Sequence, residues 1–449
     1  MSLMDDYKKE PGGKQKLQER NPKWINDDYV KFMRFAQYFI EKNGEGVMAF
    51  INPHGFLDNP TFRGMRWNLL STYDEIYTID LHGNAKKKET APDGSKDENI
   101  FDIEQGVSIN ILVKNGSKIT RPGDLGQIYH YDLYGKRKDK YTFLENTAFK
   151  DVPYQAIPNV APMYFMVPKN FGLQSEYDKF FPLNNLFPIN GNGMTTAHDN
   201  FVIDQNAQSL IKKFNNFKLS EPLEDELHKE FDVKKKNGWN ILEGWRNLQN
   251  VDVKSLIKPL AYRPFDNQYI IYEDKLVWRT VRKVMMHYAG QNLNIGLLST
   301  KACRDKIYAH AFVTTNISEA IFLSGTTGSN AMNFPLYLYP KEGGERIPNL
   351  NPDEIKAFEA ALNLPFAAEN PEKSFVPSCH LNGHPERSEG SPTDKASAQE
   401  ILRVAQNDNM PGFFTPIDML DYIYALLHSP TYRDTYKEFL KTDFPRVPY

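Results

Sequence analysis

The chain has 449 residues, of which 40% are hydrophobic and 25% are charged, and this composition predicts two to four folded domains rather than a disordered chain. Its formal net charge of −3 argues against a protein that coats nucleic acid with its whole surface. Cys303 and Cys379 are too far apart to suggest a metal knuckle or a redox pair, and no run resembles a signal peptide or a membrane span, so we expect a cytoplasmic protein.

Helices and strands are predicted to alternate over the first part of the chain. Apolar residues recur at helical spacing from Val30 to Ile40, and a second helix is predicted over about residues 62–70. Short apolar runs bounded by turn residues predict three buried strands, over residues 46–51, 76–81 and 107–113. This order is typical of an α/β sheet, in which ligands bind at the carboxyl ends of the strands. The loop that begins at Asn52 therefore lies where we expect chemistry.

The pattern changes at about Thr120, where short aromatic-rich segments are broken by Pro, Gly and Asn. These segments predict a second domain of mixed β and α structure. Three helices are predicted near the C-terminus, over about residues 352–364, 416–429 and 431–440. Residues 367–411 are rich in Ser, Pro, Glu, Asn and Gln, and we expect them to be disordered. The predicted divisions of the chain are residues 1–118, 119–350 and 351–449.

Positive charge is concentrated in one segment of this second domain. Residues 251–310 contain ten Lys or Arg against five Asp or Glu. In a chain that is acidic overall, such a segment favours contact with a polyanion such as nucleic acid. A solvated surface without a binding role is the alternative.

Seven stretches of the chain carry long motifs. The first four are DDYVKFMRFAQYFI, GEGVMAFINPHGFLDNPTFRGMRWNLL, YDEIYTIDLHGNAKKKE and DENIFDIEQGVSINILVK. The last three are NGMTTAHDNFVID, LAYRPFDNQYIIYEDKLVWRTVRKVM and LHSPTYRDTYKEFLKTDFPRVPY. The first group resembles the later half of an N6-adenine DNA methyltransferase domain. The second resembles the C-terminal specificity region of Type ISP and related single-chain restriction-modification enzymes, so the resemblance covers nearly all of the chain outside residues 367–411.

The resemblance implies a fold and a set of partners. The implied fold is a partial Rossmann-like methyltransferase sheet over residues 1–118, a mixed α+β DNA target recognition domain over 119–350 and a helical tail over 351–449. The implied partners are double-stranded DNA and the methyl donor S-adenosyl-L-methionine. The target adenine must be flipped out of the duplex, because an amino group stacked inside B-DNA cannot meet a methyl donor in line.

Two motifs of the family are not found in the sequence. One is the glycine-rich turn for the methionine moiety of the donor, and the other is the Asn-Pro-Pro-aromatic loop that holds the adenine amino group. The run Asn52-Pro53-His54-Gly55 lacks the second proline and the aromatic residue. The family's order places both motifs upstream of Met4. We therefore interpret the chain as truncated, inactive by itself, and dependent on an upstream polypeptide that carries the first half of the methyltransferase domain.

The resemblance assigns a role to Phe101, which follows a polar loop where family members place the aromatic residue that stacks on the flipped base. A phenylalanine of the hydrophobic core is the alternative. Asn52 and His54 lie at the carboxyl end of a predicted strand and are expected to border the same pocket. A hydrogen bond within the loop is the alternative for His54, since methyl transfer to an amino group requires no histidine base.

The candidate DNA contacts come from the basic segment and from one turn. They are Arg263, Lys275, Arg279, Arg282, Lys283, Lys301, Arg304, Lys306 and, in the turn, Thr195. If the segment is helical, Arg279 and Arg282 are one turn apart and point into a groove together. Ion pairs with Asp266, Glu273 or Asp274 are the alternative for some of these cations, and an ordinary domain-entry turn is the alternative for Thr195.

Two functions follow from these predictions. The first is DNA target recognition together with part of the active site of a site-specific adenine-N6 methyltransferase that uses S-adenosylmethionine. The second is a catalytically inert DNA-binding specificity module, and binding of S-adenosylmethionine distinguishes the two. A helicase or nuclease segment is disfavoured, because the sequence contains no GxxxxGK[ST] loop and no clear nuclease signature.

Overall fold

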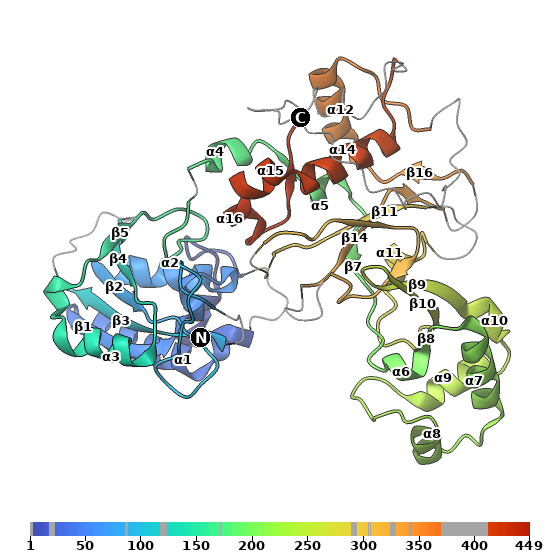
Figure 1. The fold of residues 1–449 in the computed structure, drawn as a ribbon, viewed down its shortest axis with the longest axis horizontal. Helices are drawn as coiled ribbons and strands as arrows, with labels where there is room; N and C mark the ends of the chain where they lie inside the picture. Colours follow the sequence, from blue (N-terminus) through green and yellow to red (C-terminus); the bar gives the residue numbers. More distant parts are fainter. Residues whose placement is uncertain are drawn as a thin grey trace. The chain divides into compact units, whose positions relative to one another are not determined.

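The computed structural model describes residues 3–17, 23–85, 89–116, 124–170, 172–288, 294–303, 305, 307–323, 329–340, 344–369 and 412–449. These residues form two units, Met1–Asn170 and Phe171–Tyr449 (Figure 1). The sequence analysis put the first boundary at residue 118, and the structure moves it to residue 170. The reason is that two further strands beyond residue 118 join the sheet of the first unit.

The first unit is built on a five-stranded sheet. In spatial order its strands are β1 (Gly46–Pro53), β3 (Val107–Lys114), β2 (Glu75–Asp80), β4 (Gln127–Asp132) and β5 (Gln155–Ile157). Strand β3 runs antiparallel to both β1 and β2, whereas β2 and β4 are parallel. Strands β1, β2 and β4 therefore end at the same edge of the sheet. The three predicted strands are confirmed to within two residues at each end.

Helices cover both faces of this sheet. The helical elements of the unit are η1 (Leu3–Lys8), η2 (Lys23–Asn26), α1 (Asp28–Asn43), η3 (His54–Leu57), η4 (Pro60–Phe62), α2 (Arg63–Thr72), α3 (Arg137–Asn146) and η6 (Phe149–Asp151). Met33 of α1 and Leu69 of α2 share a core with Leu112 of β3 on one face. On the other face, Phe143 of α3 packs against the cluster that contains Ile79 of β2. The two helices predicted from apolar spacing are confirmed as α1 and α2.

One edge of the sheet carries exposed apolar side chains on both faces. Strand β1 lies at the end of the strand order and pairs with β3 alone among the described strands. Val47 and Ile51 of β1 are 63% and 50% exposed. Phe32, Phe35 and Phe39, which recur at helical spacing on α1, are also exposed. We refer to these five side chains, with the free backbone of β1, as the β1 edge.

The second unit contains two four-stranded sheets. In spatial order the first is formed by β13 (Ile317–Ser318), β9 (Ile257–Arg263), β10 (Asp266–Ile271) and β8 (Ile203–Asp204). The second is formed by β12 (Phe312–Thr314), β11 (Gly296–Ser299), β14 (Met332–Pro335) and β7 (Gly191–Asn192). Each sheet has its own core. Phe214, Leu260 and Ile270 lie in the first core, and Leu297 and Phe334 lie in the second.

Helices of this unit divide between the two cores. Those of residues 199–285 are α6 (Asp199–Val202), α7 (Ala207–Leu219), α8 (Glu224–Glu230), α9 (Ile241–Leu248), α10 (Val253–Leu256) and α11 (Arg282–Met285). The other elements are α4 (Gln174–Tyr177), β6 (Phe181–Pro182), α5 (Leu183–Leu186), β15 (Tyr337–Leu338), β16 (Ile347–Pro348), α12 (Pro352–Leu362), α14 (Pro416–His428), α15 (Pro430–Thr435), α16 (Lys437–Leu440) and β17 (Arg446–Val447). Ile423 of α14 shares a core with Leu297 and Phe334, so residues 351–449 are part of the second unit and not a separate tail.

The predicted C-terminal helices are confirmed as α12 and α14, whereas the third is divided into α15 and α16. The disorder predicted for residues 367–411 falls almost entirely outside the described residues. The described residues on the two sides of this segment are in contact, since the Ala367 N–H donates to the carbonyl of Phe414 at 2.9 Å. None of the described helices combines the length and the apolar content that a membrane crossing requires. The mixed α/β class is confirmed, and the identity of the first sheet as part of a Rossmann-like methyltransferase stays a prediction.

Candidate functional site

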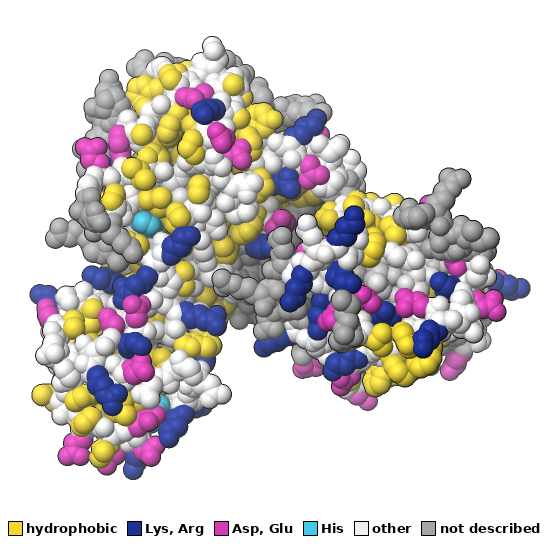
Figure 2. Space-filling model, turned by 180° about the vertical axis from the view of Figure 1, so that it is seen from behind, with side chains coloured by type: hydrophobic (Ala, Val, Ile, Leu, Met, Phe, Trp, Pro, Cys, Tyr) yellow, Lys and Arg dark blue, Asp and Glu magenta, His cyan; other side chains and the backbone are white. Residues whose placement is uncertain are grey.

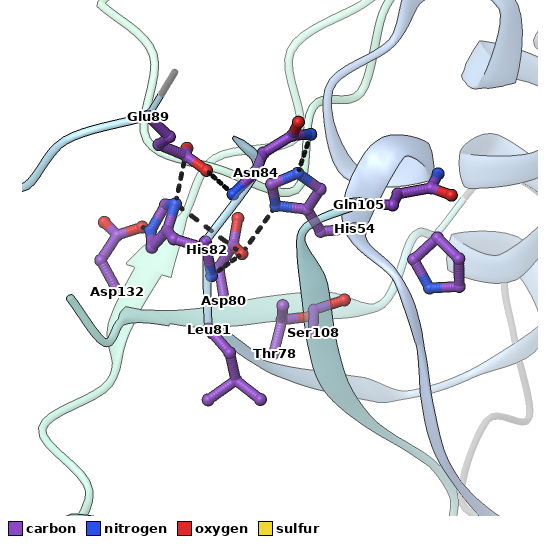
Figure 3. A network of polar contacts seen from close by, with 12 residues as sticks. His54, Thr78, Asp80, Leu81, His82, Asn84, Glu89, Gln105, Ser108 and Asp132 are labelled. Carbon is purple, nitrogen blue, oxygen red and sulfur yellow. Dashed lines mark hydrogen bonds and ion pairs between the residues drawn. The ribbon is translucent and has the colours of Figure 1, made fainter. Parts of the chain in front are cut away.

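Histidines and carboxylates gather at the edge where β1, β2 and β4 end (Figure 3). His54 directly follows β1, Asp80 and Asp132 are the last residues of β2 and β4, and His82 lies two residues beyond β2. Glu89 comes from the excursion between β2 and β3. Because parallel strands end together, the sheet brings these residues into contact although up to 78 positions separate them in sequence.

Imidazole nitrogens and carboxylate oxygens pair closely in this cluster. His54 Nδ1 lies 2.9 Å from Asp80 Oδ1. His82 Nδ1 lies 3.0 Å from Glu89 Oε1, and His82 Nε2 lies 2.8 Å from Asp132 Oδ1. We refer to these five residues as the strand-end network.

Charge in the strand-end network is partly compensated. Burial by itself lowers the pKa of His82, but hydrogen bonds with Asp132 and Glu89 and the charge of Asp80 outweigh it and raise the pKa to about 10. Burial raises the pKa of Glu89, yet hydrogen bonds from His82 and the Asn84 backbone lower it to about 2. The structure thus holds His82 as a cation between carboxylates.

The two predicted pocket-rim residues, Asn52 and His54, lie inside the first unit with 3% and 7% exposure. The side-chain oxygen of Asn52 accepts a hydrogen bond at 2.8 Å from the Asn110 side-chain amide, which also donates to the Ser108 hydroxyl at 2.9 Å. His54 contacts Asp80 at the end of β2, so its hydrogen bond reaches another strand and does not stay within its own loop. Both side chains are positioned to hold the sheet edge together.

Phe101 lies on a loop next to this network. Its side chain is 40% exposed, so it is not a residue of the hydrophobic core. The Phe101 N–H donates to the Asn99 side chain at 2.9 Å, and the Arg137 guanidinium donates to the Phe101 carbonyl at 3.1 Å. At the other end of the loop, a Cβ added to Gly106 would lie 2.5 Å from the His54 ring. The loop is therefore anchored on both sides, while the Phe101 ring remains accessible.

A buried ion pair that the sequence analysis missed supports the same loop region. Lys140 of α3 and Asp97 are 2.7 Å apart, and both side chains are 0% exposed. Lys140 Nζ also donates to the carbonyls of Leu81 and Glu98, each at 2.7 Å. Gly83 N–H donates to Asp97. The pair connects α3 to the segments before and after the excursion between β2 and β3, and a lysine in an otherwise polar helix carries no sequence signal of such burial.

In the second unit, two predicted DNA contacts lie side by side. The Thr195 N–H donates to the Arg279 carbonyl at 3.0 Å, and the Arg279 N–H donates to the Thr195 carbonyl at 2.9 Å. Beside them, the half-exposed ring of Trp278 has Lys236 Nζ at 3.9 Å and Arg279 Cζ at 4.8 Å from its centroid. We refer to Trp278, Lys236 and Arg279 as the Trp278 platform. Lys236 was not among the predicted contacts.

Other predicted DNA contacts are engaged in ion pairs. Arg263 pairs with Glu319 at 2.9 Å, Lys275 with Glu243 at 2.7 Å, and Arg282 with Asp274 at 2.5 Å. The ion-pair alternative is thus confirmed for Arg282. Lys283 and Lys301 are exposed, and Arg304 and Lys306 lie outside the described residues.

Arg279 and Arg282 do not share a helical turn, which corrects the sequence prediction. Helix α11 begins only at Arg282, and the preceding Val281 has a φ of 49°, which lies outside the right-handed helical region. Arg279 instead pairs its backbone with Thr195 in an isolated bridge. Arg279 therefore lies outside helix α11, and the two arginines are not on one turn of a helix.

Comparison with known proteins finds one family and several structures of related fold. The family model of the Type ISP C-terminal specificity domain matches residues 185–449. No curated protein sequence matches the chain as a relative. The fold is similar to a cryo-electron microscopy structure of a DrdV–DNA complex, with a TM-score of 0.63 and 20% identity over 94% of this chain and 38% of that one.

Two further structures are similar in fold. The ATP-dependent Type ISP restriction-modification enzyme LlaBIII bound to DNA has a TM-score of 0.66 and 19% identity over 100% of this chain and 26% of that one. A nuclease-deletion mutant of the Type ISP enzyme LlaGI in complex with a DNA substrate mimic has a TM-score of 0.62 and 18% identity over 99% and 37%. The chain thus spans between 26% and 38% of the length of these proteins.

Proposed function

The chain belongs to the Type ISP restriction-modification family through its C-terminal specificity domain, and on that premise we propose that its second unit recognises a site in double-stranded DNA. The observation that carries this proposal within the molecule is the Trp278 platform, in which two cations flank a half-exposed indole ring. Figure 2 shows several Lys and Arg side chains close together on the lower part of the second unit, which lies at the left of the view.

The Trp278 platform offers a cation for contact with nucleic acid. Among the described residues, the Arg279 side chain has no carboxylate partner within ion-pair distance, so its charge is available for a phosphate or a guanine edge. The cation–π contact with the Trp278 ring holds this guanidinium in position. Arg263, Lys275 and Arg282 differ from Arg279, because an acidic residue of the chain already neutralises each of them.

Replacing Arg279 with alanine is expected to weaken binding to duplex DNA and to reduce the slope of log affinity against log salt by about 1, the value for one lost phosphate contact. Fluorescence anisotropy of a labelled random-sequence duplex at several salt concentrations measures both quantities. Lys275→Ala is the matched control, since Lys275 lies in the same segment but is paired with Glu243 and should change the slope little. Equal slopes for the wild type and Arg279→Ala would contradict the proposed contact.

We further propose that the first unit supplies part of an adenine-N6 methyltransferase site, in which Phe101 stacks on the flipped base. Its support is the exposure of Phe101 beside an edge where parallel strands end. The described residues do not fit the methyl donor S-adenosylmethionine. The strand-end network fills this edge with side chains that bond to one another, and Gly83 and Gly106 pack against Asn99 and His54 without leaving a cradle. Residues outside this set must hold the donor.

The alternative function is a catalytically inert DNA-binding specificity module. It is supported by the same observation, that the described residues do not fit S-adenosylmethionine. Equilibrium dialysis of the chain against labelled S-adenosylmethionine separates the two functions. Binding and methyl transfer by the chain alone would contradict the division of the site that we propose, whereas transfer only after addition of a second polypeptide would support it.

The partner that we propose is a polypeptide that carries the first half of the methyltransferase domain, with its glycine-rich turn and its Asn-Pro-Pro-aromatic loop. The β1 edge is the surface on which it would dock. A free strand edge offers unpaired N–H and C=O groups to an added strand, and the flanking Val47, Ile51 and three phenylalanines offer apolar area on both faces. These are the two features that the next strand of a sheet and its covering helices require.

Charge introduced at the β1 edge is expected to abolish co-purification of this partner. The double variant Val47→Lys/Phe35→Glu changes two side chains that are 63% and 57% exposed, so the chain itself should remain folded. Co-expression with a tagged polypeptide that carries the two missing motifs, followed by pull-down, measures the effect. Leu219→Glu, which alters an 86% exposed leucine in the second unit, is the control and should co-purify normally. Undiminished capture of the double variant would exclude the β1 edge as the docking surface.

A further inference from the structure

We propose that His54, His82 and Glu89 bind one divalent transition-metal ion, and that zinc is the ion this ligand set favours. One potential ligand atom from each of the three residues lies within 4.8 Å of the others. His54 and His82 are 7% and 6% exposed. Together with Glu89 they lie at the sheet edge drawn in Figure 3. This site is independent of whether the protein methylates DNA.

Both imidazoles are oriented as metal-binding histidines are. His54 contacts Asp80 through Nδ1, and His82 contacts Asp132 through Nε2. A carboxylate on one ring nitrogen fixes the tautomer and makes the opposite nitrogen a better ligand. In this structure, the opposite nitrogens are His54 Nε2 and His82 Nδ1. The second of these is the nitrogen that lies 3.0 Å from Glu89 Oε1.

The charges around the site call for a cation. Asp80, Glu89 and Asp132 are the carboxylates of the cluster, and within the described residues their ion-pair partners are imidazoles alone. His130 also bonds to Asp132, at 2.9 Å. The Asp80 side chain is 6% exposed, whereas those of Glu89 and Asp132 are 21% and 36% exposed. A carboxylate as buried as Asp80 is costly unless it is paired or lies beside a metal ion. A divalent ion between His82 Nδ1 and Glu89 Oε1 would replace the proton that these two atoms share and would add one further positive charge beside the carboxylates.

The ligand types select the metal. Two imidazole nitrogens and one carboxylate oxygen form a set that zinc accepts, with metal–ligand distances of about 2.0–2.2 Å. Magnesium and calcium prefer oxygen ligands and are disfavoured. Asn84 Nδ2 lies 3.3 Å from His54 Nε2, and a half-turn of this amide would bring its oxygen to the same position as a fourth ligand. Such a closed set is typical of a structural site rather than of a catalytic one.

A metal at this position would stabilise the loop that carries Phe101. The His54 ring packs against Gly106 at the end of that loop. The backbone N–H of His54 also donates to the Gly106 carbonyl at 3.0 Å. His82 and Glu89 belong to the excursion that leads into the loop. One ion would therefore join the ends of β1 and β2 to the segment between β2 and β3.

Metal analysis of the purified full chain tests the inference. After incubation with zinc chloride and exhaustive dialysis, we expect about one zinc per chain in the wild type and a loss of at least tenfold in His82→Gln/Glu89→Gln. The matched control is His310→Gln, which alters the group of Cys303, Asp305 and His310, a set of potential ligands that shares no residue with the proposed site, and should retain the zinc. Unchanged zinc in the double variant, loss of zinc in His310→Gln, or a wild type that binds no zinc would each overturn the proposal.

A second measurement does not depend on the folding of a variant. X-ray absorption spectroscopy of the zinc-loaded wild type should show nitrogen and oxygen ligands at about 2.0–2.2 Å with imidazole scattering. A sulfur ligand at about 2.3 Å would place the ion at Cys303 instead and would overturn the proposal. Six-fold oxygen coordination without imidazole scattering would mean surface binding and would do the same.

Discussion

Lys140→Met is expected to lower the free energy of unfolding of the first unit by about 3–5 kcal/mol, because it leaves the fully buried Asp97 carboxylate without its cation. The substitution also removes the donors to the Leu81 and Glu98 carbonyls. Since the chain has two units, a single denaturation curve would mix their transitions. Urea titration read by hydrogen–deuterium exchange of peptides from residues 1–170 isolates the first unit.

Two controls separate the buried charge from other effects of this substitution. Lys96→Met removes the cation of the exposed Lys96–Glu98 pair, 2 residues from Glu98 in sequence, and is expected to change stability far less. Adding Asp97→Asn to Lys140→Met removes the unpaired charge and is expected to regain part of the loss. If Lys140→Met/Asp97→Asn is instead less stable than Lys140→Met, the unpaired Asp97 carboxylate does not explain the stability lost in Lys140→Met.

Phe101→Ala is expected to reduce methylation by about 5- to 150-fold in the complex reconstituted with the first half of the methyltransferase domain. The range corresponds to the loss of one base–aromatic stack, about 1–3 kcal/mol, and the affinity for duplex DNA should barely change. A base that is still paired in the duplex does not reach the ring, so stacking contributes only after flipping. Transfer of labelled methyl groups and anisotropy of a labelled duplex measure the two quantities separately.

The same loop provides the matched control for Phe101. Ile103 is 48% exposed, close to the 40% of Phe101, but has no aromatic face. Ile103→Ala should therefore leave methylation almost unchanged, and Phe101→Tyr should retain most of it. If Ile103→Ala and Phe101→Ala reduce methylation equally, the loop contributes through its shape and Phe101 does not stack on the base.

Local patterns predicted the elements whose signal is contained in a short run of residues. Strands β1, β2 and β3 are continuous apolar runs, and α1 has apolar residues at helical spacing, so each was placed to within a few residues. Strand β4 was missed because its sequence mixes tyrosines with His130 and Asp132. Strand β4 forms by pairing in parallel with β2, which lies about 50 residues earlier in the chain. A pairing between residues so far apart produces no pattern in the local sequence of β4.

The candidate site was predicted less well than the fold. His54 was singled out by its place after a strand, but Asp80, His82, Glu89 and Asp132 were not, because each by itself is an ordinary polar residue of a loop or strand end. Phe101 was proposed through the family resemblance; its 40% exposure argues against the alternative of a core phenylalanine, and stacking on the base stays a prediction. The predicted helical pair of Arg279 and Arg282 failed at Val281, whose positive φ is unusual for a β-branched residue.

By itself, the sequence determined the family, the order of the first helices and strands, and the segment in which the candidate DNA-binding cations lie. Only the tertiary structure decided which of those cations are neutralised, since Glu243 and Glu319 reach Lys275 and Arg263 from 32 and 56 residues away. It also decided which histidines and carboxylates meet. The physical reason is that hydrophobic periodicity is a property of neighbouring residues, whereas charges interact through space, and their partners are set by how the strands are ordered in the sheet.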